Sequence, residues 1–282
     1  MSSIILLCSC RTSFARCRSL IPGLPMFPGS GKVVVMRLFG RFKDLLRGPA
    51  QRHESVSRIR IVPTADQVHT DMVRDLLTEQ IKHGWDKSLP KPAPNPDDLY
   101  RPTLIGAWSQ DRLVGGAFVM PDSQDAQCLA VRGAYDAAEA FERCCCMIQG
   151  IAVAPERRGE GIGTRIKHAV DAWAAHHHAC LVPGIPTNDE ACRMNQKAGY
   201  VTLPPLVPLV VKITHHGHQT LCIFPIDDTV PGSRWAFRPV GQSADPALAI
   251  GQWNMEGTRR GDHDGRLPVQ WIADTTAGIP NA

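Results

Sequence analysis

Hydrophobic and polar positions along the chain follow two periods, and the changes between them separate strands from helices. Residues 57–63 alternate with a period of two, which predicts a strand. Residues 64–84 carry apolar side chains at helical spacing and end at a glycine, which predicts a helix. Residues 103–108 and 113–120 predict the two strands of a hairpin, because a short polar turn separates two apolar runs.

Beyond residue 120 the pattern predicts strands and helices in alternation. Residues 121–143 form a long connection, with a helix expected around 137–143. A strand, a helix, a short buried strand, another helix and one or two last strands are then expected at residues 145–153, 163–176, 180–185, 188–199 and 200–213. A hairpin followed by strand–helix crossovers predicts the α/β class, in the form of a mixed (α+β) sheet with helices on its faces.

Charge divides the chain into regions of different character. Residues 1–58 hold ten Lys and Arg against two acidic residues, whereas the remaining residues hold 21 against 25. We therefore expect a basic leader, a main domain and a C-terminal extension of uncertain structure, over residues 1–57, 58–216 and 217–282. The extension has scattered aromatic residues among glycine, proline and charge, so it is expected to wrap the main domain.

The leader shares features with several targeting signals and matches none of them well. Its first apolar run is too short for a secretory signal, and its arginines follow that run. It is expected to be a disordered tail, or sequence upstream of a true start at Met26 or Met36. Residues 33–47 place apolar and basic side chains on opposite helical faces, so they could form an amphipathic helix on the domain itself, on a partner or on a membrane surface.

Composition excludes several classes of protein. The chain is 43% hydrophobic and 21% charged, and no apolar run approaches the roughly 20 residues of a membrane-spanning helix. We therefore expect a soluble protein with no integral membrane segment. The mildly acidic main domain does not predict a nucleic-acid partner. The ten cysteines form no CxxC pair, which indicates reduced thiols and a cytoplasmic location, and no metal role is favoured for the histidines at 176–178 or 215–218.

The most specific segment is a passage from strand to helix at residues 148–170, which reads IQGIAVAPERRGEGIGTRIKHAV. Three glycines alternate just before the helix, where bare backbone permits positive φ and close approach of a ligand. The first turn of a helix offers unpaired N–H groups and the positive end of the helix dipole. Arg157 and Arg158 add positive charge. The segment is neither a dinucleotide fingerprint nor a Walker loop, so its chemistry predicts a pyrophosphate bound at the helix start.

This segment resembles the acetyl-CoA-binding motif of the GNAT N-acetyltransferase superfamily, V-x-P-x-x-[QR]-x-x-G-x-G/A. Its positions are occupied by Val153, Pro155, Arg158, Gly161 and Gly163. The order of elements over residues 57–213 is similar to that of the family, and so is the less specific segment NDEACRMNQKAGY at residues 188–200. The resemblance covers a little over half of the chain.

The resemblance implies a set of residues for acetyl-CoA. The strand backbone would pair with the pantetheine arm as an added strand does, at Ile151, Ala152 and Val153. The pyrophosphate would lie against the arginine of the motif and the N–H groups that follow it, at Arg158, Gly159, Glu160, Gly161, Ile162, Gly163 and Thr164. Asn188 matches a position that contacts the pantetheine or lies near it.

The catalytic positions depart from the family pattern. The family's usual proton donor is a tyrosine five residues before the final aromatic residue, which here is Tyr200, so the donor position is Asn195. An amide is no acid near pH 7, although it can donate a hydrogen bond to the sulfur. Many members use a glutamate on a neighbouring strand as base, whereas this strand offers Gln149, which could orient a water. Glu190 is the first candidate for the base.

The sequence therefore predicts an acetyl-CoA-dependent N-acetyltransferase. The enzyme would transfer acetyl directly to a primary amine of an unknown small molecule or protein, by proximity and carbonyl polarisation. Two alternatives stay open: a non-catalytic acyl-CoA sensor or interaction protein, and a transferase of a longer acyl group. Acetyl-CoA is the expected donor substrate, no metal is expected, and a homodimer is left open.

Overall fold

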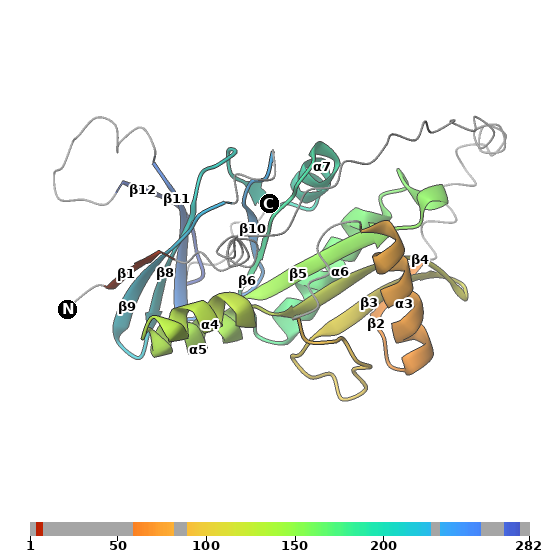
Figure 1. Cartoon of the computed structure of the whole chain (residues 1–282), viewed down its shortest axis with the longest axis horizontal. Coiled ribbons are helices and arrows are strands. Elements are labelled where there is room, and N and C mark those ends of the chain that lie inside the picture. Colours follow the sequence, from red (N-terminus) through yellow and green to blue (C-terminus); the bar gives the residue numbers. More distant parts are fainter. Residues whose placement is uncertain (1–3, 8–58, 82–88, 227–231, 255–267, 277–282) are drawn as a thin grey trace, which may run out of the picture.

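The computed structural model describes residues 4–7, 59–81, 89–226, 232–254 and 268–276. Two larger sheets lie on opposite sides of the molecule, with a three-stranded sheet between them (Figure 1). The amphipathic helix predicted at residues 33–47 lies outside the described residues. None of the described helices is long and apolar enough to cross a membrane.

A four-stranded antiparallel sheet forms the first part of the main domain. Its order is β2 (Ile59–Pro63), β3 (Thr103–Ser109), β4 (Arg112–Pro121) and β5 (Cys146–Val153). α3 (Gln67–Gln80) packs on one face and α6 (Ile162–His176) on the other (Figure 1). Because both faces are covered, β3 and β4 are buried almost throughout instead of alternating between buried and exposed positions.

The connection between β4 and β5 contains two helices where the sequence predicts one. α4 (Ser123–Val131) begins after Asp122, whose carboxylate accepts a hydrogen bond from the N–H of Asp125 at 3.4 Å. α5 (Tyr135–Cys144) follows a turn in which Gly133 has a φ of +83°. α4 buries only four of its nine residues and has a short apolar stripe, so its sequence carries a weak helical signal.

The C-terminal extension inserts a strand into the main domain. β10 (Ala236–Pro239) lies between β6 (Leu181–Gly184) and β7 (Val201–Thr202) and runs antiparallel to both. The extension therefore contributes a strand to the sheet that carries β6.

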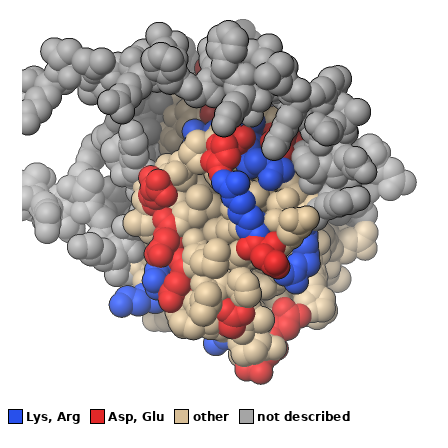
Figure 2. All heavy atoms as spheres, turned by 90° about the vertical axis from the view of Figure 1, so that its right-hand side faces the viewer, with Lys and Arg blue, Asp and Glu red and all other residues tan. Residues whose placement is uncertain are grey.

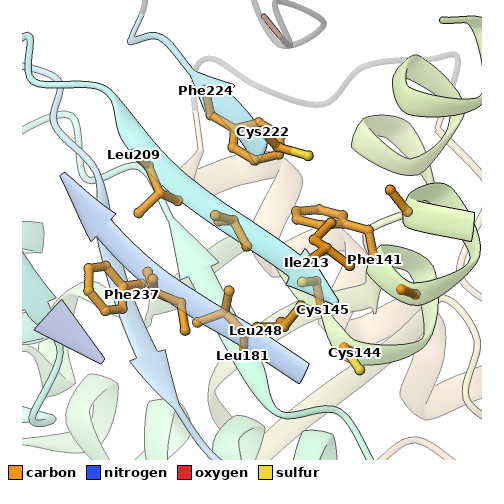
Figure 3. Close-up of a cluster of buried hydrophobic side chains, with 14 of the residues drawn as sticks. Phe141, Cys144, Cys145, Leu181, Leu209, Ile213, Cys222, Phe224, Phe237 and Leu248 are labelled. Atoms are coloured by element: carbon orange, nitrogen blue, oxygen red, sulfur yellow. The ribbon is translucent and has the colours of Figure 1, made fainter. Parts of the chain in front are cut away.

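A five-stranded sheet forms the other side of the molecule. Its order is β1 (Ile4–Leu7), β9 (His218–Phe224), β8 (Leu209–His215), β11 (Ala247–Trp253) and β12 (Val269–Asp274). Phe141 of α5 stacks on Phe224 of β9, with 5.2 Å between the ring centroids. Figure 3 shows this core, in which side chains from α5, β8, β9 and β11 point toward one another.

Two boundaries differ from those expected from sequence. The leader is predicted to be disordered, yet residues 4–7 form a strand that pairs in parallel with β9. The boundary expected at residue 216 falls inside the hairpin of β8 and β9, which pair along their whole length. Residues 200–213 read as one continuous apolar stretch, but they contribute strands to two different sheets, so the apolar pattern hides the division. We therefore propose that the C-terminal unit begins before β8.

Most of the described cysteines are small buried side chains. Six are free and buried, namely Cys144, Cys145, Cys146, Cys180, Cys192 and Cys222. This agrees with their interpretation as small hydrophobic residues. Cys128 is disulfide-bonded, which departs from the expectation that all ten cysteines are reduced thiols.

Candidate functional site

β5 and β6 meet at one end and separate at the other. At the joined end, Cys145 and Leu181 form a parallel bridge, and the N–H of Cys180 donates to the carbonyl of Cys144 at 2.8 Å. Further along, β5 pairs with β4, whereas β6 pairs with β10. Among the described strands, none pairs with the second edge of β5 beyond this bridge. The two strands are therefore joined at one end only, and we call the space beyond the bridge the gap between β5 and β6.

A bulge in β5 marks the point where the gap opens. Phe118 of β4 lies opposite Gly150, and Val119 lies opposite Ile148, so Gln149 is an extra residue in the ladder. A bulge bends its strand and increases the local twist, which turns the second half of β5 away from its neighbour. Glycine suits position 150, because a Cβ there would lie 2.4 Å from the Cδ1 of Ile81, just after α3.

The glycine loop lies at the open end of the gap. It follows β5 and the 3-10 turn η2 (Pro155–Arg157). Gly159 and Gly161 have φ of +81° and +77°, a backbone conformation that favours glycine, and no atom lies within 4 Å of the positions that their Cβ atoms would take. Gly161 is the N-cap of α6, and no side chain caps that helix. The N–H groups of its first turn are thus left for a ligand, the arrangement that binds phosphate groups.

The third glycine of the loop has a packing role. Gly163 is helical, and a Cβ on it would lie 2.8 Å from the Sδ of Met194. Met194 belongs to α7 (Asp189–Lys197), which begins at Asn188, whose Oδ1 accepts a hydrogen bond from the N–H of Ala191 at 2.8 Å. The absence of a side chain at Gly163 therefore allows α7 to pack closely against the first turn of α6.

The two arginines of the loop differ in their partners. Arg157 makes a bidentate ion pair with Glu160, with Nε–Oε1 and Nη2–Oε2 distances of 3.0 and 2.8 Å. This carboxylate raises the pKa of Arg157 and neutralises its charge. Arg158 is exposed and donates to Gln80 Oε1 at 2.8 Å and to the carbonyl of Val153 at 3.3 Å. Arg158 is thus the loop arginine whose charge stays available to an anion.

A cleft of about 560 Å³ lies between the glycine loop, β5 and α7. Its lining comes from β5, the loop and α6, α7 and the end of α3, at Ile151, Ala152, Val153, Arg157, Arg158, Gly159, Gly161, Ile162, Gly163, Thr164, Asn188, Glu190, Ala191, Arg193, Met194, Lys197 and Gln80. Basic side chains outnumber the single carboxylate. Figure 2 shows basic and acidic side chains interspersed on the side of the molecule at the right of Figure 1.

Residues 70–200 match the model of the acetyltransferase (GNAT) family. The chain contains a GNAT acetyltransferase domain. The match begins within α3 and ends just after α7, so it includes the bulged strand, the glycine loop and every residue that lines the cleft. The described strands of the five-stranded sheet lie outside it. No curated protein is significantly similar to the chain in sequence.

Several solved structures of acetyltransferases are similar to this chain at low scores. An acetyltransferase from Salmonella typhimurium with its cofactor acetyl-CoA has 10% identity and a TM-score of 0.41, covering 67% of this chain and 98% of that one. A GNAT acetyltransferase from Elizabethkingia anophelis with acetyl-CoA bound has 16% identity and a TM-score of 0.38, covering 64% and 98%. An acetyltransferase from Bacillus subtilis in complex with CoA has 15% identity and a TM-score of 0.37, covering 64% and 98%.

The structure brings together nearly all the residues that the GNAT motif predicts for acetyl-CoA. The cleft is lined by Ile151, Ala152, Val153, Arg158, Gly159, Gly161, Ile162, Gly163, Thr164 and Asn188. Glu160 does not line the cleft, because its carboxylate is held by Arg157. The side-chain oxygen of Asn188 caps α7, and its amide nitrogen can still donate to a ligand.

The three predicted catalytic residues lie in different places. Glu190 lines the cleft on the first turn of α7. Gln149, on the bulge, is outside the lining and donates through Nε2 to the sulfur of Met147. Asn195 also lies outside the lining; it is 4% exposed, and its Oδ1 is buried without a hydrogen-bond partner among the described residues. Of the three, only Glu190 is thus placed in the cleft.

Six cleft residues are absent from the sequence-based set, namely Gln80, Arg157, Ala191, Arg193, Met194 and Lys197. Arg193, Met194 and Lys197 follow Glu190 at helical spacing, so the periodicity of α7 places all four on one face. That spacing is the signal that could have identified them. Gln80 comes from α3 and reaches the cleft through a contact with Arg158 across the fold, for which the sequence offers no local signal.

One group of metal-ligating side chains occurs in the described part of the chain, away from the cleft. Ligand atoms of His215, His216 and Asp245 lie within 4.8 Å of one another. Nδ1 of His215 is 2.6 Å from Asp245 Oδ1, and the two imidazole rings stack with centroids 3.7 Å apart and planes 26° apart. Nearly parallel rings direct their nitrogen lone pairs side by side, so this arrangement does not converge on one ion.

Proposed function

We propose that the protein binds acetyl-CoA in this cleft and transfers the acetyl group directly to a primary amine of a small molecule or protein. The observation that carries the proposal is the uncapped start of α6, with two positive-φ glycines, at the open end of the gap beside β5. The uncapped helix start fits a diphosphate, and the unpaired edge of β5 fits an extended arm that contains amide groups.

Each part of acetyl-CoA has a counterpart in the cleft. The pyrophosphate would accept hydrogen bonds from the N–H groups of the loop and the first turn of α6. The pantetheine arm would lie along residues 151–153 as an added strand. Arg158 now donates to the carbonyl of Val153 and to Gln80, both at the cleft, and we expect it to exchange these contacts for the phosphates.

The chemistry is an acyl transfer in which the amine nitrogen attacks the carbonyl carbon of the thioester. The new C–N bond forms, the tetrahedral oxyanion collapses, the C–S bond breaks, and CoA leaves with the sulfur electron pair. A backbone N–H near Ile151, beside the bulge, would stabilise the oxyanion. A thiolate with a pKa of about 8.5 leaves without prior protonation, so the loss of a tyrosine at position 195 is compatible with transfer.

The proton that the amine must lose has one candidate acceptor in the cleft. Glu190 is the single carboxylate of the lining, and we propose that it accepts this proton through an intervening water. Gln149 and Asn195 carry amides, which cannot take that role. Glu190→Gln should therefore reduce transfer while leaving CoA binding intact.

Two measurements test the proposal. Calorimetric titration with CoA and acetyl-CoA should show one site with a dissociation constant in the micromolar to millimolar range. Release of free thiol from acetyl-CoA should then exceed the background when a panel of primary amines is added. Absence of binding would contradict the proposal. Binding without amine-dependent thiol release would favour a non-catalytic acyl-CoA sensor. The absence of the family's tyrosine and of its strand glutamate is the observation that favours this alternative.

The acyl group and the location are further parts of the proposal. Comparing acetyl-, propionyl- and succinyl-CoA in the same assay distinguishes an acetyltransferase from a transferase of a longer group. A cytoplasmic location is proposed because the six free cysteines are typical of a reducing compartment, although the disulfide of Cys128 is not.

A further inference from the structure

We propose that Arg238, in the C-terminal extension, is a positioning residue for the acetyl-CoA cleft because it holds α6 and α7 together. The inference rests on the proposed function and adds a residue outside the segment that matches the GNAT family, which ends at residue 200. Arg238 lies in β10, the strand that the extension inserts between β6 and β7.

One guanidinium group contacts both helices. Nη1 of Arg238 lies 3.2 Å from Oδ2 of Asp171 and 3.3 Å from Nδ1 of His168, both on α6. The same nitrogen donates to the carbonyl oxygen of Ala198, the C-cap of α7. The planar guanidinium fixes the direction of these contacts more tightly than a flexible ammonium group would.

The contact on α6 is part of a buried polar cluster. The Asp171 side chain is 9% exposed, and its Oδ1 accepts a hydrogen bond from the hydroxyl of Tyr200 at 2.5 Å. Nζ of Lys167 lies 3.7 Å from the centre of the Tyr200 ring. Burial raises the pKa of Asp171, and Arg238 is among the groups that oppose this rise. Removing the guanidinium therefore leaves a buried carboxylate with less compensation.

The contact on α7 is built into the turn that ends the helix. Gly199 has a φ of +79°, and a Cβ on it would lie 3.4 Å from Nη1 of Arg238. The guanidinium thus packs directly on the C-terminal turn of α7. Because β10 pairs with β6 and with β7, the backbone of Arg238 is fixed relative to both sides of this turn.

These two helices form the sides of the cleft. α6 supplies the N–H groups of its first turn, and α7 supplies a wall that includes Glu190, Met194 and Lys197. The fit between them is close, since Met194 would collide with any Cβ at Gly163. Arg238 does not line the cleft itself. Its effect on acetyl-CoA must therefore pass through the relative position of the two helices.

Titration of CoA into purified Arg238→Met protein tests the inference. Methionine keeps much of the side-chain volume and removes all the donors. We expect the dissociation constant to rise about tenfold while the stoichiometry stays at the wild-type value. A variant that merely unfolds in part would show the opposite, with a lower stoichiometry and an unchanged dissociation constant. Arg234→Met is the matched control, because Arg234 lies in the same extension and donates to the carbonyl of Gly232 within it.

Two conservative variants complete the design. Arg238→Lys keeps the charge and one point of donation, so its dissociation constant should lie between those of the wild type and Arg238→Met. Arg238→Gln serves in place of Arg238→Met if the latter does not fold. If the wild type binds CoA and the folded variants bind it equally well, the positioning role of Arg238 is wrong. If the wild type itself does not bind CoA, it is the proposed function that fails.

Discussion

The two ends of the gap between β5 and β6 show how one strand pair can serve stability at one end and binding at the other. At the joined end, Cys145 and Leu181 are fully buried and bridge the strands. At the open end, the edge of β5 that faces away from β4 has no strand partner among the described residues, and glycines replace bulky side chains. A bulge of one residue, Gln149, separates the two behaviours. Substitutions at the two ends should therefore affect different properties.

The largest effect on binding is expected at the open end, for Gly161→Asp. The substitution puts an anionic side chain at the N-cap of α6, where the pyrophosphate is proposed to lie, on a backbone with a φ of +77°. We expect calorimetry to detect no CoA binding at concentrations that saturate the wild type.

Gly133→Asp is the matched control for this variant. Gly133 has a φ of +83° and open space around its Cβ position, but it lies in the turn between α4 and α5, away from the cleft. The Gly133→Asp substitution imposes the same backbone strain and adds the same charge as Gly161→Asp, and it should leave the dissociation constant for CoA unchanged. Normal binding by Gly161→Asp would show that the phosphate site is misplaced.

A substitution at the joined end should instead change the stability of the protein. Leu181 is fully buried in the core that links β6 to α5 and the five-stranded sheet. Leu181→Ala should lower the free energy of unfolding by about 2–5 kcal/mol, because it removes buried apolar surface and leaves a cavity. Urea denaturation measures this loss. The folded fraction should bind CoA within about threefold of the wild type, by the rule that distant sites act independently. A larger change in affinity would mean that the joined end also sets the width of the open end.

The open end could be predicted from sequence, whereas the joined end could not. The glycine loop can be recognised from about ten residues of sequence, because a helix start, a positive φ and anion binding are all local properties. The bridge between Cys145 and Leu181, and the insertion of β10 between β6 and β7, depend on pairings across long sequence separations. The same reason explains why Gln80 and Arg238 were missed, although Arg193, Met194 and Lys197 follow from the helical spacing of α7.

A smaller effect on CoA binding is expected for Gly163→Ala, at the position where α7 packs against the first turn of α6. The new Cβ would meet the Sδ of Met194 at 2.8 Å, and the flexible methionine side chain must move into the cleft or away from it. We expect the CoA dissociation constant to rise about fivefold, a change of about 1 kcal/mol, with a stability close to that of the wild type. The double variant Gly163→Ala, Met194→Ala should recover most of this loss. A failure to recover would locate the effect in the backbone of α6 instead of in the contact with α7.

The last expected effect concerns Lys167, which lies on α6 in the buried polar cluster of Asp171 and Tyr200. Burial lowers the pKa of Lys167 from 10.5 to about 8, so between these values the unfolded chain binds more protons than the folded one. The contribution of this group to the free energy of unfolding therefore rises as the pH increases from about 8 toward 10.5. Lys167→Met lacks the titrating group, so wild-type stability relative to this variant should increase by about 2 kcal/mol between about pH 7.5 and 9.5. Urea denaturation at several pH values measures the difference. If the free energy of unfolding changes with pH in the same way for both proteins, the Lys167 amine titrates alike in the folded and unfolded chains. The polar cluster of Asp171 and Tyr200 would then be open to water.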